Sequence, residues 1–215
     1  MSKVVQKESI DQLKEELQEI KSSKNRESKS SRLKEIAKSF ASNKQWDLTL
    51  ETFQLVENER DRDILIADLV EEFLLPSQEI TQAKRFAKYI VQEQEVQPLI
   101  LIRIALAEND REQAQKIAKN ITSPLARNFA FLHIIESYLF NNQKDKAQEV
   151  CKLILENART IYDSKVRSYI LREIAVDLYF ANHEKVLAKE AALLIPDETI
   201  KTQVLNKIGI TPPNA

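Results

Sequence analysis

The chain has 215 residues, of which 43% are hydrophobic and 30% charged, and its formal net charge is −1. The near-neutral charge does not favour a polyanionic partner, and a single glycine leaves few residues suited to β-hairpins or phosphate-binding loops. Sheet-rich and glycine-loop nucleotide folds are therefore disfavoured. The apolar residues recur at helical rather than alternating spacing, so we expect an all-α protein.

The first predicted element is an amphipathic helix within residues 1–21. Its apolar stripe is formed by Ile10, Leu13, Leu17 and Ile20. A helix of this length is marginal in water on its own, so the stripe needs a partner surface. Three alternatives are open: packing on residues 33–40 as the first helix of a sixth hairpin, docking in the protein's own groove, or dimerisation. Residues 22–32 are rich in serine and basic residues, lack apolar side chains, and are predicted to be a linker.

From residue 33 onward, two apolar signatures alternate, each with residues at i, i+3, i+4 and i+7. The first occurs at Leu33, Ile36, Ala37, Phe40; Ile66, Leu69, Val70, Phe73; Pro98, Leu101, Ile102, Ala105; Phe131, Ile134, Ile135, Tyr138; and Leu171, Ile174, Ala175, Leu178. The second occurs at Thr49, Thr52, Phe53, Val56; Ala83, Phe86, Ala87, Ile90; Ala114, Ile117, Ala118, Ile121; Ala147, Val150, Cys151, Ile154; and Ala188, Ala191, Ala192, Ile195. Subtraction gives spacings of 34, 31, 33 and 41 residues between the second signatures, which is typical of stacked helical repeats.

In the third copy a frame shifted by three residues also fits. We prefer the frame that starts at Pro98, because a proline at a helix start loses no hydrogen bond. The spacing after Ala147 is longer and suggests an extended hairpin through residues 157–165.

Short polar stretches lie between each first and second signature and are predicted to be the turns of antiparallel hairpins. They are residues 43–45, 76–78, 109–110, 141–143 and 182–183. Between hairpins, we expect Ser123 and Pro124 to be the N-cap and first residue of a helix, and Pro196 and Asp197 to act similarly. Leu205, Ile208 and Gly209 are predicted to begin a final, unpaired helix.

The pattern resembles that of tetratricopeptide repeats over residues 31–195. That family has apolar residues at positions 4, 7 and 11, small ones at 8 and 20, an aromatic one at 17, and apolar ones at 24 and 27 of a unit of roughly 34. Trp46 occupies the position of the loop aromatic, and Ala83, Ala114 and Ala147 that of the small residue in the second helix. Two departures are that the glycine at position 8 is replaced throughout and that the closing proline is mostly absent. The resemblance implies a right-handed α-α superhelix, or solenoid, of about five hairpins within residues 33–215, with a capping helix at the end.

The resemblance also implies that the first helix of each hairpin lines a concave binding face. Carried over by position, the residues of that face are Ile64, Leu74, Leu75, Arg103, Leu106, Phe129, Leu139, Phe140, Tyr169, Tyr179 and Phe180. The row is apolar and aromatic, which suits an amphipathic helix or an extended apolar peptide; alternatively, several members pack beneath neighbouring helices. Candidate cations for a carboxylate clamp of this family are Lys34, Lys38, Arg103 and Arg172, but the asparagine of the clamp is missing.

The sequence offers little for catalysis. His133 and His183 have no ligand-type neighbours at zinc-binding spacing. Cys151 takes the place that alanine has in other copies, so we expect it to be a buried small residue. The acidic run at residues 57–63 alternates with arginines and lacks the spacing of a calcium loop, so we expect a solvated junction. We expect no enzymatic activity, no metal and no cofactor.

The leading hypothesis is a non-enzymatic scaffold or chaperone-like adaptor that binds a protein segment on the concave face. Its strongest candidate residues are Leu75, Leu139, Phe140, Tyr179 and Phe180. One alternative is an RNA-binding helical repeat, supported only by the basic linker; another is a module that self-assembles or dimerises through residues 1–21. No apolar run reaches the length of a membrane span, and the start of the chain lacks the apolar segment of a signal peptide, so we expect a cytoplasmic protein.

Overall fold

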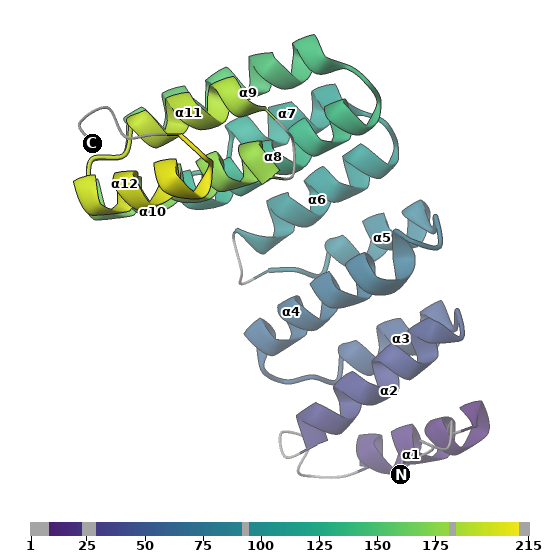
Figure 1. The fold of residues 1–215 in the computed structure, drawn as a ribbon. Helices are drawn as coiled ribbons and strands as arrows, with labels where there is room; N and C mark the ends of the chain where they lie inside the picture. Colours follow the sequence, from purple (N-terminus) through teal and green to yellow (C-terminus); the bar gives the residue numbers. More distant parts are fainter. Residues whose placement is uncertain (1–8, 23–28, 92–94, 181–183, 211–215) are drawn as a thin grey trace, which may run out of the picture. The chain divides into compact units, whose positions relative to one another are not determined.

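The computed structural model describes residues 9–22, 29–91, 95–180 and 184–210, which form α-helices and one π-helical turn, with no strand (Figure 1). The all-α expectation is confirmed. No helix in these ranges is long and apolar enough to cross a membrane. The chain divides into two compact units, residues 1–107 and 108–215. The boundary falls between the two helices of the third predicted pair.

Unit 1 is built from short helices that pack on their neighbours along the chain. They are α1 (Ile10–Ser22), α2 (Ser30–Ser42), α3 (Trp46–Phe53), α4 (Glu59–Leu69), the π-helical turn η2 (Val70–Leu74), α5 (Ile80–Ala87) and α6 (Val96–Ala107). Helix α2 packs on α1, α3 and α4, and α4 packs on α5 and α6. Because α2 begins at Ser30, the last residues of the predicted linker are helical. Pro98 lies in the first turn of α6, where its nitrogen has no intrahelical acceptor to lose.

One apolar cluster fills unit 1 and includes the stripe of α1. Leu13, Leu17 and Ile20 are buried in the same cluster as the inward residues of α2 and α4. The Phe53 ring lies edge-on to Phe86, with ring centroids 5.1 Å apart. In this structure the stripe is therefore covered within unit 1, by packing on α2. Residues 1–8 of the predicted helix and 23–28 of the predicted linker lie outside the described residues.

Unit 2 includes three helices of 16 or 17 residues, which are longer than any described helix of unit 1. The helices of unit 2 are α7 (Arg111–Lys119), α8 (Pro124–Phe140), α9 (Lys144–Arg159), α10 (Ser164–Phe180), α11 (Lys185–Leu193) and α12 (Glu198–Lys207). Helix α8 packs on α7, α9 and α10, and α12 closes the unit against α10 and α11. The extra length predicted after Ala147 is helical, because α9 continues to Arg159 and α10 begins at Ser164.

The helix boundaries of unit 2 confirm two predicted caps and correct one element. Ser123 caps α8, with Pro124 as the first helical residue. Asp197 caps α12 by accepting a hydrogen bond from the Ile200 N–H at 2.9 Å. The prediction that Gly209 helps to begin the last helix is wrong. Gly209 follows the end of α12 in a left-handed conformation with φ 70°, because the helix already starts at the Asp197 cap.

The turns inside the helix pairs share one backbone feature. A residue with positive φ lies in each described turn: Lys44 (56°), Gln78 (59°), Asn109 (62°) and Asn142 (56°). In three of them the following N–H donates to the carbonyl five residues back, from Gln45 to Phe40, Glu79 to Leu74 and Gln143 to Tyr138. This closes the preceding helix in a Schellman turn. The turns therefore form without glycine, at a conformational cost to the other residue types.

In three of the predicted helix pairs, a buried polar residue near the start of the first helix forms a hydrogen bond with a residue at or just after the end of the second helix. The Asp63 carboxylate accepts from the Val91 N–H at 3.2 Å, the Ser168 hydroxyl accepts from the Asp197 N–H at 3.2 Å, and Asn128 Oδ1 accepts from Asn157 Nδ2 at 2.7 Å. We call these the pair-closing bonds. They correct the prediction of a solvated junction at residues 57–63 for Asp63, whereas residues 57–60 are exposed as predicted. Because α4 starts at Glu59, Asp63 is carried onto its inward face and is fully buried.

Candidate binding face on helices α8 and α10

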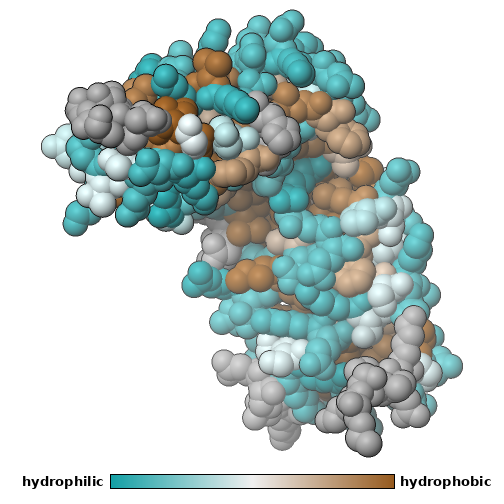
Figure 2. All heavy atoms as spheres, viewed as in Figure 1, coloured by the Kyte–Doolittle hydropathy of each residue, from teal (hydrophilic) through white to brown (hydrophobic). Residues whose placement is uncertain are grey.

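Ion pairs occupy the first helices of unit 1. They join α2 to α4 and the η2 turn, and η2 to α6: Lys34–Asp61 (3.1 Å), Lys38–Asp68 (3.0 Å), Lys38–Glu72 (3.1 Å) and Arg103–Glu71 (3.0 Å). Hydrophilic side chains cover most of the visible face of α2 and α4 in Figure 2. Three of the four candidate clamp cations thus already face carboxylates, and the fourth, Arg172, pairs with Glu173. An incoming carboxylate would have to compete with these groups.

The apolar residues predicted for the binding face of unit 1 are mostly withdrawn from solvent. Ile64 is 45% exposed, whereas Leu75 and Leu106 are half-buried and Leu75 packs against the core. Leu74 is fully buried, so its predicted place on the face is wrong. The cause is the π-helical turn, which accommodates an extra residue and rotates Leu74 toward the core.

In unit 2, by contrast, the predicted aromatic residues remain in contact with solvent. Phe140 is 88% exposed, Phe180 50% and Tyr169 47%, whereas Leu139 and Tyr179 are half-buried. Tyr179 lies edge-on to Phe180, with ring centroids 4.9 Å apart. The Arg172 guanidinium lies 4.5 Å from the centre of the Tyr169 ring. Exposed aromatic side chains on first helices are therefore a feature of α8 and α10.

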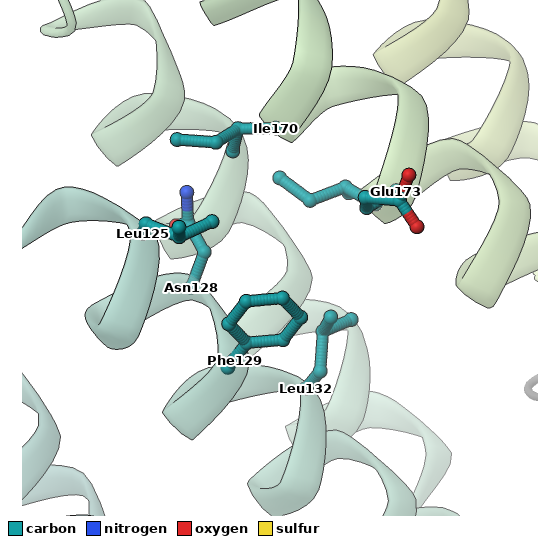
Figure 3. Close-up of a pocket in the computed structure, with 7 residues that line it drawn as sticks. Leu125, Asn128, Phe129, Leu132, Ile170 and Glu173 are labelled. Atoms are coloured by element: carbon teal, nitrogen blue, oxygen red, sulfur yellow. The ribbon is translucent and has the colours of Figure 1, made fainter. Parts of the chain in front are cut away.

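Phe129 is the one predicted residue that lines a depression between α8 and α10 (Figure 3). The depression has an empty volume of about 180 Å³, including the part open to solvent. Its lining residues are Leu125, Asn128, Phe129, Leu132, Ile170, Glu173 and Ile174. The other lining residues were not predicted as site residues. A usable signal exists for Asn128, because Asp63 and Ser168 occupy the same place three residues before an apolar signature.

Asn128 is the polar residue at the base of this depression. It is 2% exposed, and the orientation of its amide follows from a chain of hydrogen bonds. The Arg127 guanidinium can only donate, so Asn157 Oδ1 accepts from it at 2.8 Å; Asn157 Nδ2 then donates to Asn128 Oδ1 at 2.7 Å. Asn128 Nδ2 is thereby left as a buried donor without a partner. In Figure 3 this nitrogen points toward Ile170, beside Leu125.

Carboxylates gather one helical turn further along the same two helices. Glu173 is at the edge of the depression, Asp177 follows it on α10, and Glu136 follows Leu132 on α8. Burial raises the pKa of Asp177, and the negative charges of Glu173 and Glu136 raise it further, against the opposing effect of His133. His133 Nδ1 lies 3.2 Å from Glu136 Oε2. Among the described residues, no three acidic, histidine or cysteine side chains are placed to hold a metal ion; His183 lies outside them.

Two further candidates in unit 2 have structural roles. Cys151 is fully buried, as predicted, and burial followed by the charge of Glu184 raises its thiol pKa to about 12. A more open depression, with about 560 Å³ of empty volume counted out to solvent, includes Lys119 and Arg127 in its lining. The Arg127 guanidinium is already committed to the Ile121 carbonyl at 2.8 Å and to Asn157, so it is not free to bind an anion.

No protein-family model, curated protein or solved structure matches this chain.

Proposed function

We propose that the chain is a non-enzymatic scaffold of tetratricopeptide-like hairpins, stacked in a right-handed solenoid, that binds a protein segment through the first helices of unit 2. Three features support the hairpin stack: the alternating apolar signatures, the left-handed turns and the pair-closing bonds. Each of them recurs with the same relation to the signatures, as expected of stacked similar units.

The observation that carries the binding role is the exposed aromatic and aliphatic surface of α8 and α10. Leu125, Phe129, Tyr169 and Phe140 are each more than a third exposed, and the first two lie at a depression. Exposed apolar patches on otherwise polar proteins are typical of interaction sites, and aromatic residues contribute strongly to binding energy. The first helices of unit 1 instead carry ion pairs, so we assign binding to unit 2.

The same surface argues against RNA as the ligand. Aromatic rings can stack on bases, but a nucleic-acid site also needs cations for the phosphates. Glu136, Glu173 and Asp177 lie beside the depression on α8 and α10, and Arg172 is paired with Glu173. The burial of the α1 stripe in unit 1 likewise removes the main support for self-assembly through residues 1–21.

The test is quantitative capture of partners from the native cell by single-site variants. Phe129→Ser and Phe140→Ser are expected to lose captured proteins that the unmodified chain retains. Tyr162→Ser is the matched control, because Tyr162 is 99% exposed but lies in the connection between α9 and α10. Far-UV circular dichroism establishes that each variant is folded. Equal capture by all three folded variants would refute the proposed binding face.

A further inference from the structure

The unpaired donor of Asn128 distinguishes this residue from its counterparts at the other pair-closing bonds. Asp63 and Ser168 close their helix pairs by accepting a hydrogen bond, and Asn128 does so through Oδ1. An acceptor alone is therefore enough for that structural role. The amide adds a second group, Nδ2, whose hydrogen atoms are buried without an acceptor. Leaving a buried donor unpaired is unfavourable, so a ligand that supplies an acceptor recovers this energy on binding.

The surroundings of Nδ2 specify what kind of group can supply that acceptor. The neighbouring side chains of Leu125, Phe129 and Ile170 are aliphatic or aromatic, and the Glu173 carboxylate is held by Arg172 at 2.6 Å. A buried water molecule usually has about three polar partners, and this lining offers one donor. A peptide fits better, because it combines a main-chain carbonyl with an apolar side chain.

The walls also show how such a group can reach the donor. Leu132, Ile170 and Ile174 are buried and form a fixed floor. Leu125 and Phe129 are 37% and 39% exposed, which makes them the lining residues with the most freedom to change rotamer. Solvent does not reach Nδ2 in the present arrangement. The incoming residue therefore displaces Leu125 or Phe129 from the mouth of the depression.

The charge of the protein surface beside the depression determines which ligand residues can lie next to the inserted one. The carboxylates of Glu136, Glu173 and Asp177 lie along α8 and α10 beside the depression. Burial raises the pKa of Asp177, and the negative charges of Glu173 and Glu136 raise it further. Arg172 pairs with Glu173, and His133 Nδ1 lies 3.2 Å from Glu136 Oε2. A lysine or arginine of a ligand would relieve the repulsion, whereas an acidic ligand would increase it.

We propose that this depression binds an internal, basic segment of a partner protein, with one aliphatic side chain inserted beside Phe129 and its main-chain carbonyl accepting from Asn128 Nδ2. Lysine or arginine residues next to the inserted one contact the carboxylates of Glu136 and Asp177. The assignment rests on the proposed scaffold function and names the chemistry of the bound segment.

The probe is a pentapeptide, capped at both ends, with one leucine between two pairs of lysines. The peptide is titrated into the isotopically labelled full chain, and NMR follows the side-chain amide resonance of Asn128. This resonance is assigned because it is missing from the spectrum of Asn128→Asp. We expect this resonance to shift. Asn128→Asp keeps an acceptor toward Asn157 and loses the donor, so we expect it to weaken the peptide about tenfold, the loss of one hydrogen bond. The added negative charge alone would strengthen binding of a basic peptide, which makes a loss decisive.

Asn141→Asp is the matched control. Asn141 is the C-cap of α8, is exposed and donates to the Ser137 carbonyl. The variant therefore adds the same charge at the end of the same helix and should leave the affinity unchanged within about twofold. Replacing the lysines of the probe by glutamates, or its leucine by glycine, should abolish binding. An unmoved Asn128 resonance, or equal affinity for Asn128→Asp, would overturn the role of the donor.

Two outcomes separate this inference from the proposed function. If Asn128→Asp binds the probe normally while Phe140→Ser still loses its captured proteins, the inference fails and the scaffold function stands. If the probe binds only with a free C-terminal carboxylate, the site recognises chain ends and the assignment to an internal segment is overturned.

Discussion

Removal of Asn157 is expected to destabilise unit 2 far more than removal of its partner Asn128. Asn157 is 8% exposed and accepts from Arg127 at 2.8 Å while donating to Asn128 at 2.7 Å and to the Pro124 carbonyl at 3.4 Å. Asn157→Ala breaks one charge-assisted hydrogen bond and two neutral ones, of which the bond to Pro124 is long, and leaves Asn128 Oδ1 buried and unpaired. Arg127 keeps its bonds to the Ile121 and Thr122 carbonyls. The expected loss is about 3 kcal/mol.

Asn128→Ala has a smaller expected cost, although it removes a residue that is more deeply buried. It breaks the same neutral hydrogen bond but also removes the donor that has no partner, so the two effects partly cancel. The expected loss is about 1 kcal/mol. The asymmetry between the two alanine variants follows from the direction of the hydrogen-bond chain and from the further hydrogen bonds of Asn157.

Urea denaturation measures both variants by two signals. Far-UV circular dichroism follows the helices of the whole chain, whereas fluorescence of Trp46, the single tryptophan, reports on unit 1. With a slope of about 2 kcal/mol per molar urea, Asn157→Ala should lower the midpoint of the unit 2 transition by about 1.5 M. Equal losses for the two variants, or a larger one for Asn128→Ala, would refute the assigned direction of the network.

Four other substitutions have effects whose sign follows from the structure. Gln78→Gly should stabilise unit 1 by about 1 kcal/mol and Gly209→Ala should destabilise unit 2 by a similar amount, because both positions have positive φ; urea midpoints check both. The pKa of Cys151 is raised from 9.0 to about 12, so above pH 9 the unfolded chain loses a proton that the folded chain retains. The free energy of unfolding should therefore fall as the pH rises from 9 toward 12, by at most about 1.4 kcal/mol per pH unit. In Cys151→Ala the part of this fall that is due to the thiol should be absent. The hydrogen bond from Arg32 lowers the pKa of Glu16. The stabilisation of the fold by this pair is therefore present above pH 4.5 and is lost as the pH falls through the pKa of Glu16 in the folded chain. In Arg32→Gln, stability should depend less on pH at the acid end of a stability–pH curve.

The helices could be predicted from the sequence because the spacing of the apolar residues shows which side of each helix is buried. The stripe from Leu13 to Ile20 and the alanine-like burial of Cys151 are examples. Apolar spacing does not record local changes in helical register. The π-helical turn moved Leu74 from the predicted face to the core for that reason.

The base of the candidate site was missed for a different reason. Asn128 and Asp63 are polar, and polar residues next to an apolar signature are ordinarily placed in solvent. Their burial depends on acceptors and donors supplied by the following helix, as between Asn128 and Asn157. Such pairing is a property of the packed structure, and an apolar pattern carries no information about it. The exposed rings of Phe129 and Phe140 were predictable because they fall on the first-helix positions.

The pair-closing bonds join residues that have a nearly constant separation in the sequence. They span 28 residues from Asp63 to Val91 and 29 residues in both later cases, from Asn128 to Asn157 and from Ser168 to Asp197. The intervals between second signatures nevertheless vary from 31 to 41 residues. In the last two pairs, the longer interval of 41 residues from Ala147 to Ala188 therefore arises in residues 158–167, between the closed segments, and not within a segment. An insertion or deletion in the connection between α9 and α10 is therefore expected to leave the closed segments on both sides intact.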